Sequence, residues 1–84
     1  MSFAEKFNQT NPRYLEKLLR AHPSLTQREI LVCMYLKLNY TNKEISDLMS
    51  ISLVTIDTYR HNIRKKIGLN RKDKLITYLN TIHR

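Results

Sequence analysis

Six basic residues lie between positions 52 and 72, and this segment is the part of the sequence best suited to binding chemistry. Asp57 is the single acidic residue within it. If the segment is helical, short polar side chains occupy its first half and cations crowd its second half. Short polar groups suit the edges of bases, and cations suit phosphate. The alternative is a solvated helix face with cations placed favourably near a helix C-terminus.

The whole chain shares this positive bias. It has 84 residues, 15 lysines and arginines against 7 acidic residues, a net charge of +8 and a pI near 9.9. Such an excess in one small domain indicates a polyanionic partner, most often nucleic acid. If about six to eight cations meet phosphates, affinity should fall by roughly three to five decades between 50 and 200 mM salt. We expect no membrane insertion, because the face opposite the cations is needed for the core.

The sequence does not favour an enzyme. Its three histidines are far apart and lie beside no nucleophile motif, and a single glycine excludes a glycine-rich phosphate loop. No metal-ligand spacing is present. Cys33 lies in an apolar stretch, which predicts a buried thiol, and one cysteine alone indicates a reducing, cytosolic setting. We therefore expect no catalytic residues, no cofactor and no metal.

Helix-capping signals define the elements that position the basic segment. Thr26 with Glu29, and again Thr41 with Glu44, have the spacing of capping boxes, and Ser52 is a third N-cap. Helices often end at a residue in the left-handed conformation, which Asn and Gly adopt most easily. Asn39 follows the first of these helices and Gly68 follows the third. About three residues separate the second helix from the third, as in a helix-turn-helix. The predicted helices cover about 27–38, 42–50 and 53–67.

The 53–67 helix is predicted to be two-faced. Ile56, Ile63 and Ile67, with Tyr59 or Arg60, form one stripe at helical spacing, which indicates the core face. The remaining side chains should form an exposed arc, made of Val54, Asp57, Thr58, His61, Arg64 and Lys65.

The two ends of the chain give weaker signals. The first ten residues show no clear periodicity, and Asn11-Pro12 predicts the start of a short amphipathic helix over about 12–21. At the other end, Asn70 predicts the cap of a last helix over about 71–83. The expected fold is therefore all-α, with residues 1–24 as an N-terminal extension and 25–84 as the domain.

From Leu25 to about Ile82 the chain resembles the LuxR/GerE-type helix-turn-helix domain of bacterial transcription regulators. Four motifs in this order support the resemblance: Leu25-Thr26-x-Arg28-Glu29, Asn42-Lys43-Glu44-Ile45, Ile51-Ser52-x-x-Thr55-Ile56 and Arg64-Lys65-Lys66-Ile67-Gly68-Leu69. The resemblance implies a compact four-helix domain, here with one extra short N-terminal helix, that binds double-stranded DNA in the cytoplasm, at the bacterial nucleoid. It also suggests that these residues are the output end of a longer regulator.

The resemblance also implies site residues. The 53–67 helix would enter the major groove, with Asp57, Thr58 and His61 facing bases. Residues facing phosphate would be Lys43, Thr55, Tyr59, Arg60, Arg64 and Lys65. The last helix would offer a homodimer contact, for which the candidates are Tyr78, Leu79 and Ile82, and RNA polymerase is a further expected partner.

Three positions depart from the family pattern. Asn39 stands where the family usually has Gly after the first helix, a tolerable exchange. Asp57 stands where the family often has Lys, and Tyr59 where it often has His. Asp57 removes an attraction to phosphate; it either accepts a hydrogen bond from a cytosine amino group or helps the helix to start. The DNA-binding role therefore transfers to this chain better than any operator sequence.

Two other functions remain open. A protein-interaction module on a helix-turn-helix scaffold would use exposed apolar residues such as Leu53 and Val54. A sigma-factor promoter-binding domain shares the Leu-Thr-x-Arg-Glu opening and the Glu-Ile pair. The ending Lys66–Leu69, followed by a further helix, favours the LuxR-type assignment.

Overall fold

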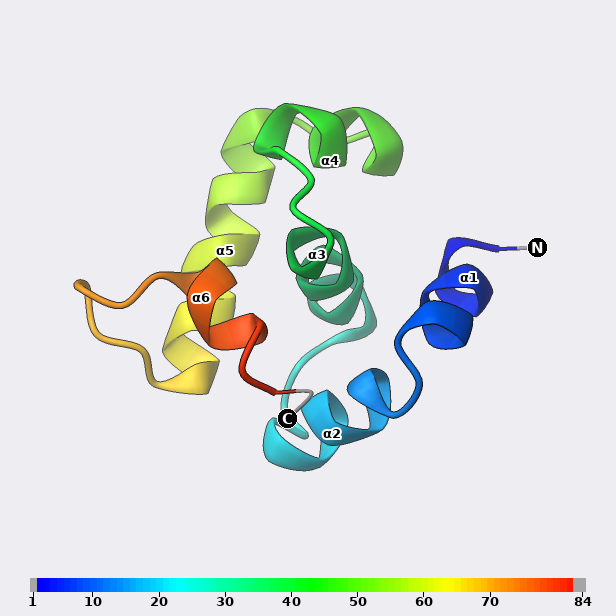
Figure 1. The fold of residues 1–84 in the computed structure, drawn as a ribbon. Helices are drawn as coiled ribbons and strands as arrows, with labels where there is room; N and C mark the ends of the chain where they lie inside the picture. Colours follow the sequence, from blue (N-terminus) through cyan, green and yellow to red (C-terminus); the bar gives the residue numbers. More distant parts are fainter. Residues whose placement is uncertain (1, 83–84) are drawn as a thin grey trace.

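The computed structural model describes residues 2–82, and these residues form helices and connecting turns without a strand. This confirms the all-α fold class. α3 lies at the centre, and the other helices surround it (Figure 1). The helices are α1 (Phe3–Thr10), α2 (Tyr14–Ala21), α3 (Gln27–Lys37), α4 (Asn42–Met49), α5 (Leu53–Ile67) and α6 (Leu75–Leu79).

The three central helices begin and end within one residue of their predicted bounds. Both capping boxes form: the Thr26 N–H donates to Glu29 Oε1 at 2.8 Å, and the Thr41 N–H donates to Glu44 Oε1 at 2.9 Å. Asn39 has φ 65° and Gly68 has φ 84°, so both end their helices in the predicted left-handed conformation. Local sequence signals therefore determine α3, α4 and α5.

We expect Thr41→Ala to lower the free energy of unfolding by about 0.5–2 kcal/mol, because the Glu44 N–H loses its cap acceptor at the start of α4. Urea denaturation measures this change. Thr77→Ala, an exposed threonine inside α6, is the matched control and should stay within about 0.5 kcal/mol of the wild-type chain. Equal stability of the two variants would contradict a role for the box.

The N-terminal region differs from the prediction. The first ten residues are not irregular, because α1 forms there: Ser2 Oγ accepts the Glu5 N–H at 3.2 Å, and Phe7 is fully buried. Two aromatic residues one turn apart hold this helix: Phe7 is buried, and half-buried Phe3 stacks on Tyr35 with ring centroids 4.3 Å apart. Two residues are too few to give a clear period in the sequence. Two helices, not one, therefore precede the four-helix part.

Asn11-Pro12 does not start the second helix. The Asn11 N–H donates to the Phe7 carbonyl at 2.8 Å, so Asn11 ends α1. α2 begins two residues after Pro12, behind Arg13, which has φ 70° and makes no side-chain cap. Asparagine is favoured at both ends of helices, and here Asn11 ends α1 instead of starting α2.

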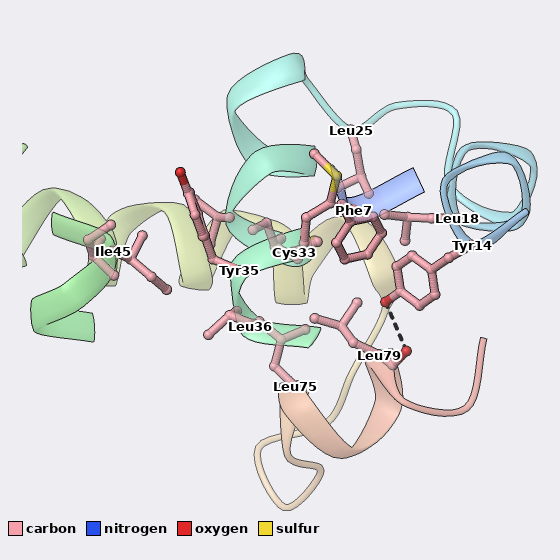
Figure 2. Close-up of a cluster of buried hydrophobic side chains, with 14 residues drawn as sticks. Phe7, Tyr14, Leu18, Leu25, Cys33, Tyr35, Leu36, Ile45, Leu75 and Leu79 are labelled. Carbon is pink, nitrogen blue, oxygen red and sulfur yellow. Dashed lines mark hydrogen bonds between the residues drawn. The ribbon is translucent and has the colours of Figure 1, made fainter. Parts of the chain in front are cut away.

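The core joins the N-terminal helices to the rest of the chain (Figure 2). Tyr14 Oη donates to the Leu79 carbonyl of α6 at 2.9 Å, and both residues are buried. α3 is buried over most of its circumference, including Cys33, as predicted. Burial raises the pKa of the Cys33 thiol to about 12, so this thiol is protonated at neutral pH. The buried apolar residues from α1, α2, α3 and α6 form one cluster.

The last helix is shorter than predicted. α6 begins after Lys74 rather than at Asn70, and it ends at Leu79; residue 83 lies outside the described residues. Residues 70–73 instead form a turn bound to α5 by Arg64. The guanidinium of Arg64 donates to the carbonyls of Asp73 and Asn70 at 2.7 and 2.6 Å. These tertiary hydrogen bonds outweigh the local preference of Asn70 for a helix cap.

Leu79 was a candidate for a homodimer contact, and this prediction is wrong. Its side chain has no exposed area, and its carbonyl accepts the Tyr14 hydroxyl of the same chain. Tyr78 and Ile82 are half-buried at the rim of the same face. Only these two of the three candidates can meet a second copy.

Candidate nucleic-acid interface

α4 and α5 form a tightly joined pair of helices, with α4 at the N-terminal end of α5 (Figure 1). Ser50 adopts the left-handed conformation at φ 56°, and the Ile51 N–H donates back to the Ser46 carbonyl at 3.0 Å. Ser52 then caps α5 by accepting the Thr55 N–H at 3.1 Å. This short connection fixes α5 relative to the core and positions its exposed face.

The exposed face of α5 is the predicted arc without Arg64, which is half-buried and bound to the turn at 70–73. Ile56 and Ile63 are fully buried on one side of the helix. The exposed side chains on the opposite side recur at helical spacing, and we call this set the α5 arc: Val54, Asp57, Thr58, His61 and Lys65. The three residues predicted to face bases thus share one solvent-exposed strip, and the helix has the two faces that the sequence indicated.

The polar groups of the α5 arc have different bonding states. Thr58 Oγ1 donates to the Val54 carbonyl at 3.1 Å, so its lone pairs are left to accept a hydrogen bond from a ligand. Asp57 and His61 have no hydrogen-bond or ion-pair partner among residues 2–82. Asp57 lies in the second turn of α5, and the first turn contains no acidic residue. Because a helix dipole acts mainly within the first turn, this position favours the base-facing interpretation of Asp57 over help at the helix start.

The predicted phosphate contacts divide into two groups. In the first group the side chains can reach a ligand. Lys65 is exposed and has no partner in the described part of the chain. Lys43 pairs with Asp47 at 3.0 Å, but both side chains are more than three-fifths exposed, and such surface pairs are weak. Thr55 and Tyr59 are half-buried beside the α5 arc.

In the second group the cations are bound within the domain. Arg60 is half-buried and its guanidinium donates to Asn42 Oδ1 of α4 at 2.9 Å. Arg64 holds the turn after α5, as described above. Lys66, which the resemblance did not place on DNA, binds Glu29 at 2.6 Å and the Ser24 carbonyl at 3.1 Å. Of the six basic residues between positions 52 and 72, three therefore stabilise the fold.

Sequence reasoning missed these internal partners. The capping-box motif predicted a role for Glu29, but no pattern in the sequence predicts its ion pair with Lys66, 37 residues later. The acceptors for Arg64 are backbone carbonyls, which no side-chain pattern reveals. The half-buried position of Arg60 was signalled in part, because Arg60 could also be assigned to the core stripe.

The ion pair between Glu29 and Lys66 should make stability depend on pH. Burial alone would raise the pKa of Glu29, but hydrogen bonds from Lys66 and from the backbone and side chain of Thr26 outweigh burial and hold it below its ordinary value of 4.5. A lowered pKa means that Glu29 contributes stability above its unfolded pKa and loses this contribution as the pH falls through its folded pKa.

We therefore expect unfolding midpoints in urea to drop between pH 7 and about pH 3, and Glu29→Gln to flatten this part of the profile. Lys66→Met, which removes the partner, should lower stability at pH 7 and reduce the pH dependence as well. If both variants keep the wild-type slope, the pair does not couple to folding.

Neither a membrane span nor a metal-ligand cluster is found in the described residues. No helix within residues 2–82 is long and apolar enough to cross a bilayer. In the same part of the chain no three His, Cys, Asp or Glu side chains gather where they could hold an ion.

An all-helical core, a tightly connected pair α4–α5 and an exposed polar arc on the second helix together define a helix-turn-helix domain of DNA-binding transcription regulators. The chain belongs to the family described as bacterial regulatory proteins, luxR family, whose model matches residues 23–79. This agrees with the resemblance seen in the sequence.

Two relatives are similar to this chain over a part of their own length. It is 37% identical over 54 residues to the fimbriae Z protein of Escherichia coli K12, a match that covers 64% of this chain and 26% of that protein. It is 32% identical over 54 residues to the oxygen regulatory protein NreC of Staphylococcus aureus JH9, covering 64% and 25%. The matched segment thus spans about a quarter of each relative. No solved structure matches the chain.

Proposed function

We propose that this domain binds double-stranded DNA sequence-specifically, with α5 in the major groove, as the output part of a bacterial transcription regulator in the cytoplasm. The observation that supports this most strongly is the α5 arc: a polar, exposed strip opposite Ile56 and Ile63, on a domain of net charge +8. Asp57, Thr58 and His61 face bases in this proposal.

The proposed phosphate contacts centre on Lys65, Lys43, Thr55 and Tyr59. The two lysines by their charge, and Thr55 and Tyr59 by their hydroxyl groups, would fix the orientation of the domain on a duplex, while Asp57, Thr58 and His61 select the sequence. Arg60 and Arg64 are held by neutral acceptors, the amide of Asn42 and the carbonyls of the turn at 70–73, so each keeps its charge and further N–H donors for a phosphate within reach.

The experiment that tests DNA binding is selection of duplexes from a random pool by the purified chain, followed by titration at two salt concentrations. Enrichment of a common sequence and salt-sensitive affinity are the expected results. The absence of any enriched or bound duplex, even in dilute buffer, would contradict the proposal and support the protein-interaction module instead.

A matched pair of variants separates a phosphate contact from a structural cation. Lys65→Ala should weaken binding to all duplexes about equally and reduce the log–log salt slope by about 1, with no loss of stability. Arg64→Ala should lower the urea midpoint, because the carbonyls of Asn70 and Asp73 lose their donor. If Lys65→Ala destabilises the domain and Arg64→Ala does not, the assignment of Lys65 to phosphate and of Arg64 to the fold is wrong.

We also propose that two copies, if they meet through α6, do so by its rim residues Tyr78 and Ile82, and that RNA polymerase is a partner of the longer regulator. The support for the first point is the partial exposure of both side chains beside buried Leu79. Twofold symmetry in the selected duplexes would support the dimer, and a single unrepeated site would contradict it.

A further inference from the structure

Val54 is an apolar side chain that the fold leaves in water. It is 74% exposed, more than any other large hydrophobic residue in the described part of the chain. It lies in the first turn of α5, on the side opposite the buried residues Ile56 and Ile63. Neither the core nor the connection to α4 uses this side chain.

The position of Val54 places it beside the polar residues proposed to face bases. It precedes Asp57 by three residues and Thr58 by four, so all three lie on one strip of the helix. The Thr58 hydroxyl donates to the Val54 carbonyl, which holds Thr58 over the same turn. The N-terminal residues of a recognition helix are those that contact base edges in the groove, and Val54 is the apolar member at that end.

One base edge in the major groove is apolar. Thymine alone among the four bases presents a methyl group there, and an apolar side chain recognises it by contact. Valine suits this contact because its β-branch leaves one preferred rotamer in a helix, so little side-chain freedom is lost on binding. Leu53 is less exposed, at 49%, and its side chain lies to one side of this strip because it precedes Val54 by one residue on the helix.

We propose that Val54 is a specificity-determining residue that selects thymine through its 5-methyl group at one position of the bound sequence. This inference rests on the proposed DNA binding. The inference adds to the proposed function the identity of one recognised base and the chemical group of that base that Val54 contacts.

The test replaces each thymine of the selected duplex, one at a time, by deoxyuridine, which differs only by the missing methyl group. At one position the wild-type chain should lose affinity about three- to fivefold, the value expected for one buried methyl-sized group. Val54→Ala should bind the thymine duplex more weakly, and the same replacement should then have little effect, because the partner of the methyl group is gone. Alanine suits a helix, so this variant should fold.

Leu48→Ala is the matched control, since Leu48 is an exposed apolar residue on α4, 56% exposed and outside the α5 arc. It should retain the wild-type response to deoxyuridine. Three results would overturn the inference: tolerance of deoxyuridine at every position by the wild-type chain, an undiminished response in Val54→Ala, or loss of the response in Leu48→Ala. In all three cases the duplex still binds and the proposed function stands, whereas failure of the wild-type chain to bind any duplex would overturn both.

Discussion

Raising the salt concentration from 50 to 200 mM is expected to weaken duplex binding by about two orders of magnitude. Each neutralised phosphate contributes about 0.9 to the log–log salt slope, and about four cations remain free or exchangeable around α5. Two of these cations are the proposed phosphate contacts Lys43 and Lys65, and the other two are Arg71 and Lys72, which are exposed in the turn that follows α5. The count of basic residues in the sequence alone would give a much steeper loss, of roughly three to five decades.

Fluorescence anisotropy of a labelled duplex across this salt range measures the slope. A loss of three decades or more would show that Arg60, Arg64 or Lys66 also neutralise phosphate, in addition to the four cations counted here. Lys6→Ala removes an exposed cation from α1, on the far side of the domain from α5 (Figure 1), and should leave the slope unchanged. This control separates local phosphate contacts from an effect of net charge.

Phe7→Ala should destabilise the domain by about 3–5 kcal/mol, the usual cost of removing a buried phenylalanine. The Phe7 ring is 1% exposed and meets the Tyr14 ring edge-on, with centroids 5.4 Å apart. A small domain has a total stability near the lower end of about 5–15 kcal/mol, so this loss would leave a large part of the molecules unfolded.

Urea denaturation followed by circular dichroism measures the effect of Phe7→Ala. Asn8→Ala changes the exposed neighbour on the same helix and should stay within about 0.5 kcal/mol of the wild-type value. If Phe7→Ala is equally mild, α1 does not belong to the folding unit.

The part of the fold that could be predicted is the part determined locally. α3, α4 and α5 each have a side-chain cap at their start, and α3 and α5 end at Asn39 and Gly68, so their bounds follow from short sequence motifs. α1 and α6 depend on distant contacts, from Phe7 to the core and from Arg64 to the turn before α6. Local motifs at Asn11 and Asn70 were misleading for different reasons. Asn11 ends the preceding helix α1, and the hydrogen bonds of Arg64 hold Asn70 in a turn.

The candidate site also has a part that follows from local sequence patterns and a part that depends on distant contacts. Helical periodicity predicted which side of α5 is exposed, because Ile56 and Ile63 recur at helical spacing and the opposite residues do not. Periodicity could not show which cations are free, since Arg60 and Lys66 find partners 18 and 37 residues away. The charge of a basic segment is therefore an upper limit on what it offers to a ligand.

The covering of α6 by α2 has a consequence for assembly. Tyr14 binds the Leu79 carbonyl, and His22 Nε2 lies 2.5 Å from the Tyr78 hydroxyl, so residues 14–22 cover one side of α6. A second copy that bound this side of α6 would have to displace an intramolecular segment that is present at high local concentration.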